Sequence, residues 1–148
     1  MIELSIRPAV AADHPIIKQM VRRERLDPTS LKWQNFLIAE HAGQIVGIGQ
    51  IKRYPGCNEL GSLITNRRYR GKRVAARLIA ALEDQAGFPL YLLCAGKMEP
   101  YYQRFGYQTI GWHAAPPFLM LKTFPALLLR LFGIQIRVMQ KIGRDPAS

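Results

Sequence analysis

The chain has 148 residues, which is long enough to bury a hydrophobic core within one domain of common size. Hydrophobic residues make up 49% of it and aromatic residues 9%, a composition that excludes an intrinsically disordered chain. The 21 Lys and Arg residues outnumber the 10 Asp and Glu residues and leave a net charge of +11, which favours an anionic partner: a phosphate-bearing cofactor, nucleic acid or an acidic surface.

The sequence carries no sign of a metal site, a disulfide framework or a targeting segment. Cys57 and Cys94 lie far apart without neighbouring metal-ligand residues, so we expect reduced cysteines and no metal. The start, MIELSIRPAV, lacks the basic and apolar regions of a signal peptide. The segment FPALLLRLFGI is shorter than the roughly 20 residues that span a bilayer, and it contains Arg130. We therefore expect a cytoplasmic protein.

The first elements are a strand and an amphipathic helix. Apolar and polar residues alternate over 2–6, which predicts a half-buried strand that Pro8 ends. Asp13 is a candidate N-cap for a helix with Pro15 in its first turn. The apolar face of this helix consists of Ile16, Ile17, Met20 and Val21. Its C-terminal turn is basic, with Arg22, Arg23 and Arg25, as suits the helix dipole.

A hairpin follows. Residues 36–41 and 45–54 have the composition of strands, and Ala42-Gly43-Gln44 forms the turn between them. Gly47 and Gly49 lie inside the second strand, where glycine indicates a bulge or the close approach of another backbone.

The next stretch combines a strand, a basic turn and a helix. The apolar run 60–65 predicts a buried strand, and Val74, Leu78 and Leu82 then recur at helical spacing until Gly87 and Pro89. The turn between them is basic, with Arg67, Arg68, Arg70, Gly71, Lys72 and Arg73. The first N–H groups of a helix have no internal partner, and the helix dipole adds partial positive charge there. This arrangement favours a phosphate site over the alternative of a solvated charge run.

The remaining residues predict further strands around short helices. Residues 89–95 form an internal strand, so the preceding helix is a crossover that implies one parallel pairing. Residues 99–105 form a short helix that Gly106 ends. Closing strands are expected at 107–112 and 118–123, a helix at 125–132 and a strand at 134–142. The expected fold is α/β (α+β): a mixed, mostly antiparallel sheet of about six or seven strands flanked by helices, in a single domain over 1–148.

Three motifs resemble one known family. YRGKRVAARLIAAL is similar to the acyl-CoA-binding signature of the GNAT superfamily, the acetyl-CoA-dependent N-acetyltransferases, with Arg70 at its first position and Ala75 at its last. Arg73 stands where the family usually has Gly, which tolerates unusual dihedral angles. We expect Arg73 to serve there with a negative φ and its side chain swung clear.

The other two motifs flank this signature in the family order. EPYYQRFGY resembles the late motif through Tyr102, Gly106 and Tyr107, although Ala95 replaces the Asn that often ends the preceding strand. ELGSLIT resembles the strand before the phosphate turn and opens with Glu59. The resemblance covers about 2–123 and leaves a C-terminal helix-strand extension of about 124–142 outside it.

The resemblance implies a cofactor site and two catalytic residues. Acetyl-CoA would be held by the backbone N–H groups of Gly71, Lys72, Arg73, Val74 and Ala75, by the charges of Arg70 and Lys72, and by the strand backbone at Leu63, Ile64 and Thr65. Tyr102 is the candidate general acid, because a phenol holds its proton at neutral pH; its alternative role is packing. Glu59 is the candidate general base, directly or through water, or else an ordinary polar residue at a strand start. His14, His41 and His113 are isolated.

We therefore expect an N-acetyltransferase that moves an acetyl group from acetyl-CoA to a primary amine, of a small molecule or of a protein. One alternative is a catalytically weak or inactive acyl-CoA-binding protein. Another is a basic module that binds nucleic acid or a membrane surface, for which residues 118–142 offer apolar residues interspersed with Lys and Arg. The C-terminal extension could also hold a homodimer together.

Overall fold

The computed structural model describes residues 2–144 of the chain. These residues divide into two compact units. The first unit contains the chain up to Lys52 together with Leu60–Ala86, and the second contains Arg53–Glu59 together with the chain from Gly87 onward. The expectation of a single domain over the whole chain stays a prediction.

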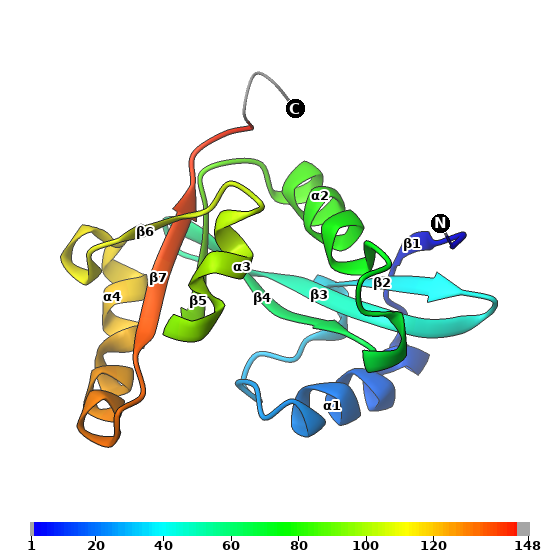
Figure 1. Ribbon diagram of the computed structural model, residues 1–148, viewed down its shortest axis with the longest axis horizontal. Coiled ribbons are helices and arrows are strands. Elements are labelled where there is room, and N and C mark those ends of the chain that lie inside the picture. Colours follow the sequence, from blue (N-terminus) through cyan, green and yellow to red (C-terminus); the bar gives the residue numbers. More distant parts are fainter. Residues whose placement is uncertain (1, 145–148) are drawn as a thin grey trace. The chain divides into compact units, whose positions relative to one another are not determined.

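The first unit contains a sheet in the order β1-β2-β3-β4 (Figure 1). Its strands are β1 (Ser5–Pro8), β2 (Phe36–His41), β3 (Gln44–Tyr54) and β4 (Cys57–Thr65), the last two of which extend into the second unit. The pairings of β2 with β1 and with β3 are antiparallel, so the predicted hairpin is confirmed. The pairing register shifts by one residue between Ala39 and Glu40, which pair with Gly47 and Ile45, so the irregularity lies in β3 at Val46, next to Gly47, where a bulge was one of the two predicted features.

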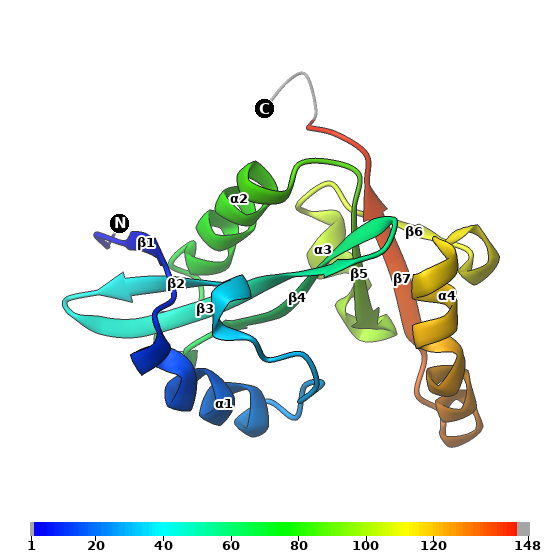
Figure 2. The ribbon, with the colours of Figure 1, turned by 180° about the vertical axis from the view of Figure 1, so that it is seen from behind.

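Two helices cover opposite faces of this sheet, α1 (His14–Arg23) on one side and α2 (Val74–Ala86) on the other (Figures 1 and 2). The core under α1 contains Ile17 and Val21 against the strand residues Phe36, Ile38 and Ile48. These side chains are fully buried, which is why the apolar stripe of the sequence predicted this helix correctly.

The glycines of β3 allow α2 to lie close to the sheet. A Cβ atom at Gly47 would stand 2.6 Å from Val74 Cγ1, and one at Gly49 would stand 2.9 Å from Leu82 Cδ1. The predicted close approach at these two positions is therefore confirmed, and a side chain at either would push the helix outward.

Asp13 precedes α1 as predicted, but it does not cap the helix. Its carboxylate accepts hydrogen bonds from Arg7 at 2.8 and 3.0 Å and from the Val10 N–H at 2.8 Å, so it ties β1 to the turn before the helix. The predicted N-cap role is wrong because the nearby guanidinium and the Val10 amide take both carboxylate oxygens.

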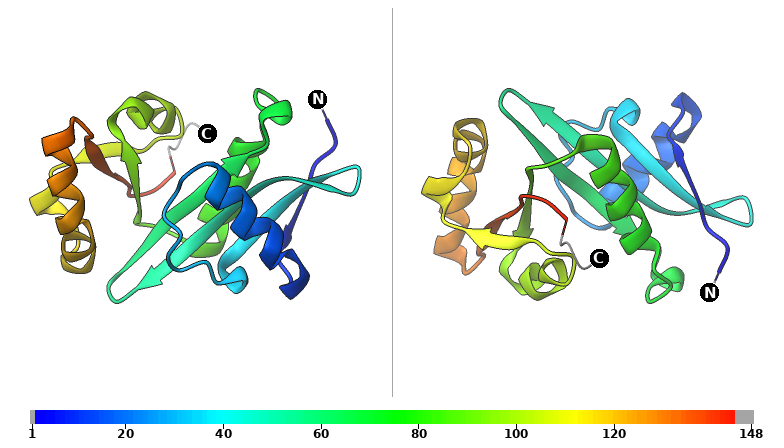
Figure 3. Two further views of the ribbon diagram at one scale, coloured as in Figure 1. Left: turned by 90° about the horizontal axis from the view of Figure 1, so that it is seen from below. Right: turned by 90° about the horizontal axis from the view of Figure 1, so that it is seen from above.

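The second unit contains a sheet in the order β5-β7-β6 with antiparallel pairing. Its strands are β5 (Leu90–Ala95), β6 (Gln108–Ile110) and β7 (Ile136–Lys141). The helices α3 (Glu99–Gln103) and α4 (Pro117–Thr123) lie on opposite faces of β5 and β7, as Figures 2 and 3 show. The prediction of a strand at 118–123 is wrong, since this segment is α4.

This segment is a helix because of the two prolines at its start, Pro116 and Pro117. Proline has no N–H and its φ suits the first turn of a helix, and Pro117 occupies that turn. The helix then begins with a hydrogen bond from the Met120 N–H to the Pro116 carbonyl at 3.0 Å. The tail continues as a 3₁₀ helix, η6 (Phe124–Phe132), and then as β7, close to the predicted helix and strand.

The described residues thus form seven strands and four α-helices, which confirms the predicted mixed, mostly antiparallel α/β class. None of the helices within residues 2–144 is both long and apolar enough to cross a lipid bilayer.

Candidate functional site

The turn between β4 and α2 begins at Asn66. The Asn66 N–H donates to the Val46 carbonyl at 2.8 Å and so fixes the end of β4 against β3. The Asn66 side-chain oxygen accepts from the Arg68 N–H at 3.1 Å and caps the short 3₁₀ helix η3 (Arg67–Tyr69). The strand end and the following basic turn are therefore held together by hydrogen bonds within the first unit.

The N–H groups at the start of α2 are available to a ligand. The first bond of the helix runs from the Arg77 N–H to the Arg73 carbonyl at 3.1 Å. In the part of the chain that the structure describes, the earlier N–H groups of Gly71, Arg73, Val74 and Ala75 have no protein acceptor. Unsatisfied N–H groups at the positive end of a helix dipole form an anion site.

Lys72 departs from this pattern. Its N–H donates to the Tyr69 carbonyl at 3.3 Å, while its side chain is exposed. Both the ammonium and the N–H of Lys72 were predicted to bind phosphate. The exposed ammonium is available to such a ligand, whereas the N–H already has a weak partner in the protein.

Arg73 has a φ of +65°, so the expectation of a negative φ is wrong. The left-handed region costs a non-glycine residue about 1–2 kcal/mol, because its Cβ approaches the following carbonyl. Gly71, two residues earlier, also has a positive φ of +79°. The turn thus has the backbone conformation that glycine favours at position 73 although arginine occupies it.

The side chains of the turn form a positively charged surface. Arg67, Arg68, Arg70, Lys72 and Arg73 are all exposed. The Arg70 guanidinium lies 4.0 Å from the Glu24 carboxylate, at the limit of an ion pair. Within residues 2–144, the other four have no acidic partner at that distance, so most of this charge remains available to a phosphate ligand.

Sequence reasoning missed a kink in β4 just before this turn. Ser62 has a φ of +50° inside the strand, and its hydroxyl accepts a hydrogen bond from Gln50 Nε2 at 2.9 Å. Gln50 is fully buried, a polar residue in the apolar strand VGIGQIK, and this was the one signal that the sequence offered. Strand distortions of this kind occur next to active sites, and here the kink adjoins the predicted cofactor residues Leu63, Ile64 and Thr65.

Tyr102 lies in α3, where its ring packs edge-on against its neighbours. The ring centroids of Tyr101 and Tyr107 lie 5.2 and 6.4 Å from that of Tyr102. Burial raises the pKa of the Tyr102 phenol well above its ordinary value, and the nearby Cys94 and Tyr101 raise it further. The hydroxyl therefore stays protonated at neutral and moderately alkaline pH, as a proton donor requires.

Glu59 lies in the second unit and is 3% exposed. Lys122 of α4 donates to both of its carboxylate oxygens at 3.2 Å and also to the Tyr54 hydroxyl. The sequence did not indicate Lys122, because its segment was expected to be a strand. The structure thus places the two predicted catalytic residues in the second unit and all the predicted cofactor residues in the first.

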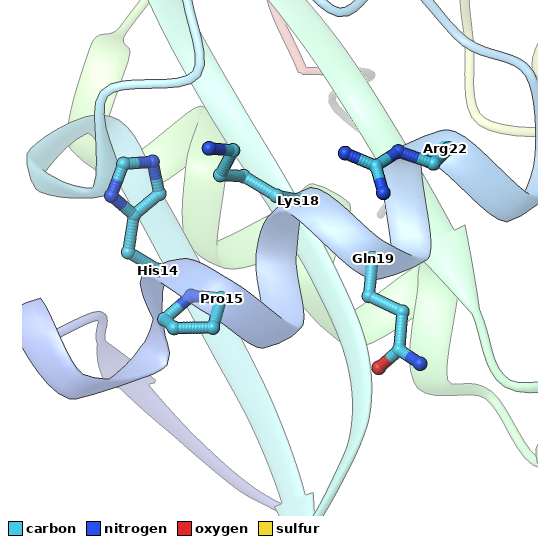
Figure 4. Close-up of a pocket in the computed structure, with 5 residues that line it drawn as sticks. All are labelled: His14, Pro15, Lys18, Gln19 and Arg22. Carbon is cyan, nitrogen blue, oxygen red and sulfur yellow. The ribbon is translucent and has the colours of Figure 1, made fainter.

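The exposed face of α1 carries a shallow hollow of about 300 Å³. It is lined by His14, Pro15, Lys18, Gln19 and Arg22, and the His14, Lys18 and Arg22 side chains extend from the same side of the helix (Figure 4). The Lys18 ammonium and the Arg22 guanidinium add positive charge to the basic surface of the first unit. No group of three potential metal ligands is found within residues 2–144.

Comparison with known proteins identifies the family but no curated relative. A family model described as an acetyltransferase (GNAT) domain matches residues 32–109, a span that contains β2 to β5 and all but the last residue of β6. A search of curated proteins gave no match.

Solved structures share the fold at low sequence identity. N-acetylglutamate synthase from Neisseria gonorrhoeae, complexed with coenzyme A and N-acetyl-glutamate, aligns with 98% of this chain at 21% identity and a TM-score of 0.79, and the chain covers 36% of that protein. Rv2747 from Mycobacterium tuberculosis, in complex with CoA and NLQ, aligns with 93% of the chain and 98% of its own length, at 17% identity and a TM-score of 0.72.

A GNAT-family acetyltransferase from Staphylococcus aureus aligns with 96% of the chain and 100% of its own length, at 14% identity and a TM-score of 0.71. The chain therefore spans about a third of the length of the synthase and nearly all of the length of the other two. The matched family model covers more than half of the chain and includes β4, the basic turn and the start of α2, so the chain belongs to the GNAT family of acetyltransferases.

Proposed function

We propose that this protein transfers an acetyl group from acetyl-CoA directly to a primary amine. The observation that carries this proposal is the row of unbonded N–H groups at Gly71, Arg73, Val74 and Ala75, which follows a basic turn at the end of a strand. A diphosphate is the ligand whose charge and oxygen acceptors fit such a row. Membership of the GNAT family and the CoA in solved relatives support acyl-CoA as that ligand.

The proposed binding mode uses both sides of the turn. The pyrophosphate accepts hydrogen bonds from the unbonded N–H groups, and the exposed Arg70 and Lys72 add charge. The pantetheine arm lies along the β4 backbone at Leu63, Ile64 and Thr65, beyond the kink at Ser62. A backbone N–H of this strand stabilises the oxyanion of the tetrahedral intermediate, a contribution of about 2.7–4 kcal/mol in other enzymes.

The reaction needs one proton acceptor and one proton donor. The acceptor amine reaches the site as an ammonium and must lose a proton before its nitrogen attacks the thioester carbonyl. The C–N bond forms and the C–S bond breaks; the nitrogen gives up its second proton as the amide forms, and the leaving thiolate takes up one proton. Both proton transfers have candidate residues in the second unit.

Tyr102 is the proposed donor to the thiolate. Its raised pKa keeps the proton on the phenol until a strong base is formed next to it. Replacing Tyr102 with Phe removes the hydroxyl but keeps the ring packing, and should lower kcat about 100-fold. Tyr101→Phe is the matched control, because it removes a hydroxyl from the adjacent residue of the same helix. Equal rates for the two variants would exclude Tyr102 as the acid.

Glu59 is the proposed acceptor of the ammonium proton, directly or through a water molecule. Its ion pair with Lys122 offers a competing structural role, and two variants separate these roles. Glu59→Gln removes the base, whereas Lys122→Met removes the ion pair and keeps the carboxylate. If Glu59 is the base, Glu59→Gln should lower kcat far more than Lys122→Met does. If both variants lose similar stability and keep the kcat of the wild type, the role of Glu59 is structural.

The acceptor is proposed to be a small molecule or protein that carries a primary amine. A solved relative is complexed with coenzyme A and N-acetyl-glutamate, so L-glutamate is the first amine to test. The panel should also include a polyamine, a lysine-containing peptide and a peptide with a free N-terminus, since the net charge of +11 suits an acidic macromolecule as well.

The decisive assay measures thiol release from acetyl-CoA in the presence of each amine. Turnover with at least one amine supports the transferase. Binding of acetyl-CoA without turnover on any amine would favour an acyl-CoA-binding protein without activity. Binding of nucleic acid or anionic vesicles with no binding of acetyl-CoA would instead favour the basic module, to which the cations of α1 would then contribute.

A further inference from the structure

A buried glutamine stands beside the kink in β4. Gln50 lies in β3 and is 0% exposed, and its Nε2 group donates to the Ser62 hydroxyl at 2.9 Å. The side-chain oxygen of Gln50 has no hydrogen-bond partner within residues 2–144. A buried acceptor without a partner destabilises the folded state, so folding alone does not account for a glutamine at this position.

Ser62 is the residue that this hydrogen bond restrains. Its φ of +50° lies in the left-handed region, which is unfavourable for a residue with a Cβ, and it occurs inside a strand. Such a conformation persists only where the surrounding structure fixes it. In the part of the chain that the structure describes, the bond from Gln50 is the one side-chain hydrogen bond that Ser62 makes. Gln50 is therefore the side chain that holds the kink in place.

The residues after the kink are anchored on both faces of the sheet. Ile64 packs in the core under α1. Leu63 lies on the α2 face, since its Cδ1 and that of Leu82 both come within 3.2 Å of a Cβ atom placed at Gly49. These side chains cannot shift to absorb a change at Ser62, so a change in its φ would rotate the adjoining peptide groups. A strand distortion of this kind sets the direction of the backbone groups next to it.

We infer that Gln50 is a positioning residue for acyl transfer, which acts through the kink at Ser62 on the backbone that binds the pantetheine arm and the oxyanion. The inference rests on the proposed function, because that function assigns these contacts to Leu63, Ile64 and Thr65. In this role Gln50 touches neither the cofactor nor the acceptor. Its buried hydrogen bond fixes where the N–H and C=O groups of the strand point, and a displacement of about 1 Å in such a contact can lower a rate about 100-fold.

Gln50→Met tests the inference, because methionine keeps the length of the side chain and removes its hydrogen-bonding groups. Calorimetric titration with CoA should show about 10-fold weaker binding, as expected when one or two hydrogen bonds to the ligand are weakened. The melting temperature should stay the same or rise, because the unpartnered oxygen is removed as well. A glutamine that serves stability alone predicts the reverse, a lower melting temperature with unchanged affinity, and that result would overturn the inference.

Ile48→Val is the matched control. Ile48 is fully buried two residues earlier in β3, so its variant should lose stability and keep the affinity for CoA. A second measurement repeats Gln50→Met in a Ser62→Gly background. Glycine adopts a φ of +50° without the Cβ penalty, so the kink no longer depends on Gln50, and the affinity should change by less than about 2-fold. An equal loss of affinity in both backgrounds would overturn the inference.

Amide NMR spectra separate this inference from the proposed function. Addition of CoA to the wild type should shift the signals of Leu63, Ile64 and Thr65 together with that of Val74 at the start of α2. In Gln50→Met the shifts on β4 should shrink, while the shift of Val74 remains. Full shifts on β4 in this variant would overturn the inference and leave the proposed function standing. A wild type that binds no CoA would overturn both.

Discussion

Replacing Arg73 with Gly should stabilise the protein. Arg73 has a φ of +65°, which costs a residue with a Cβ about 1–2 kcal/mol, and glycine removes this cost. Glycine also gains conformational freedom in the unfolded chain, which takes back about 0.4–1 kcal/mol. The net gain should be about 0.5–1 kcal/mol, or about 2–3 °C in melting temperature for a chain of this length.

Urea and thermal unfolding of Arg73→Gly, Arg73→Ala and the wild type measure this effect. Arg73→Ala removes the same guanidinium but keeps a Cβ in the left-handed region, so it should not gain stability. The Arg73 side chain is exposed, so its removal leaves no cavity. A glycine variant no more stable than the alanine variant would refute the assignment of backbone strain to this residue.

The same two variants separate the backbone of the turn from its charge in cofactor binding. If the backbone N–H groups hold the diphosphate, Arg73→Gly should keep or improve the affinity for CoA, and Arg73→Ala should bind no better than the wild type. An equal, large loss in both variants would show that the Arg73 guanidinium is itself a phosphate ligand.

Three further changes test the fold around the site. Gly47→Ala should cost about 2 kcal/mol of stability in urea unfolding, because its Cβ would stand 2.6 Å from Val74 Cγ1; an unchanged midpoint would contradict the close packing of α2. Burial raises the pKa of Cys94 to about 11, so iodoacetamide at pH 8 should label this thiol far more slowly in the folded protein than in urea; equal rates would be inconsistent with this burial. Asp13→Asn should cost about 2 kcal/mol at pH 7, because it breaks the bidentate bond with Arg7. Since the Arg7 hydrogen bonds lower the pKa of Asp13 in the folded state, the difference from wild type should be complete above about pH 4 and shrink as the pH falls through that lowered pKa; a difference that grows as the pH falls below about 4 would contradict this linkage.

Local patterns were enough to predict much of the fold. Strand β2 has the composition of a strand and helix α2 carries apolar residues at helical spacing, and Gly87 ends the helix with a φ of +72°, as its position after the last apolar residue suggested. The segment 118–123 was misassigned because a short apolar run suits a strand and a buried helix equally, and Pro117 was the feature that distinguished them.

The candidate site was less predictable, because its details depend on contacts between distant residues. The basic turn and the helix start follow from adjacent residues and were found. The hydrogen bond between Gln50 and Ser62 and the ion pair between Glu59 and Lys122 join residues far apart in the chain, so no local pattern encodes them. The positive φ of Arg73 was also not predictable, since the surrounding turn imposes it against the preference of the residue.

The central claim is that the first N–H groups of α2 bind the diphosphate of CoA. A titration of ¹⁵N-labelled protein with CoA, followed by amide NMR spectra, tests it directly, with pantetheine as the control that lacks the diphosphate. We predict that the amide signals of Gly71, Arg73, Val74 and Ala75 shift and saturate with CoA and stay in place with pantetheine. Saturable CoA binding that leaves these four signals unchanged, or no binding at all, would contradict the claim.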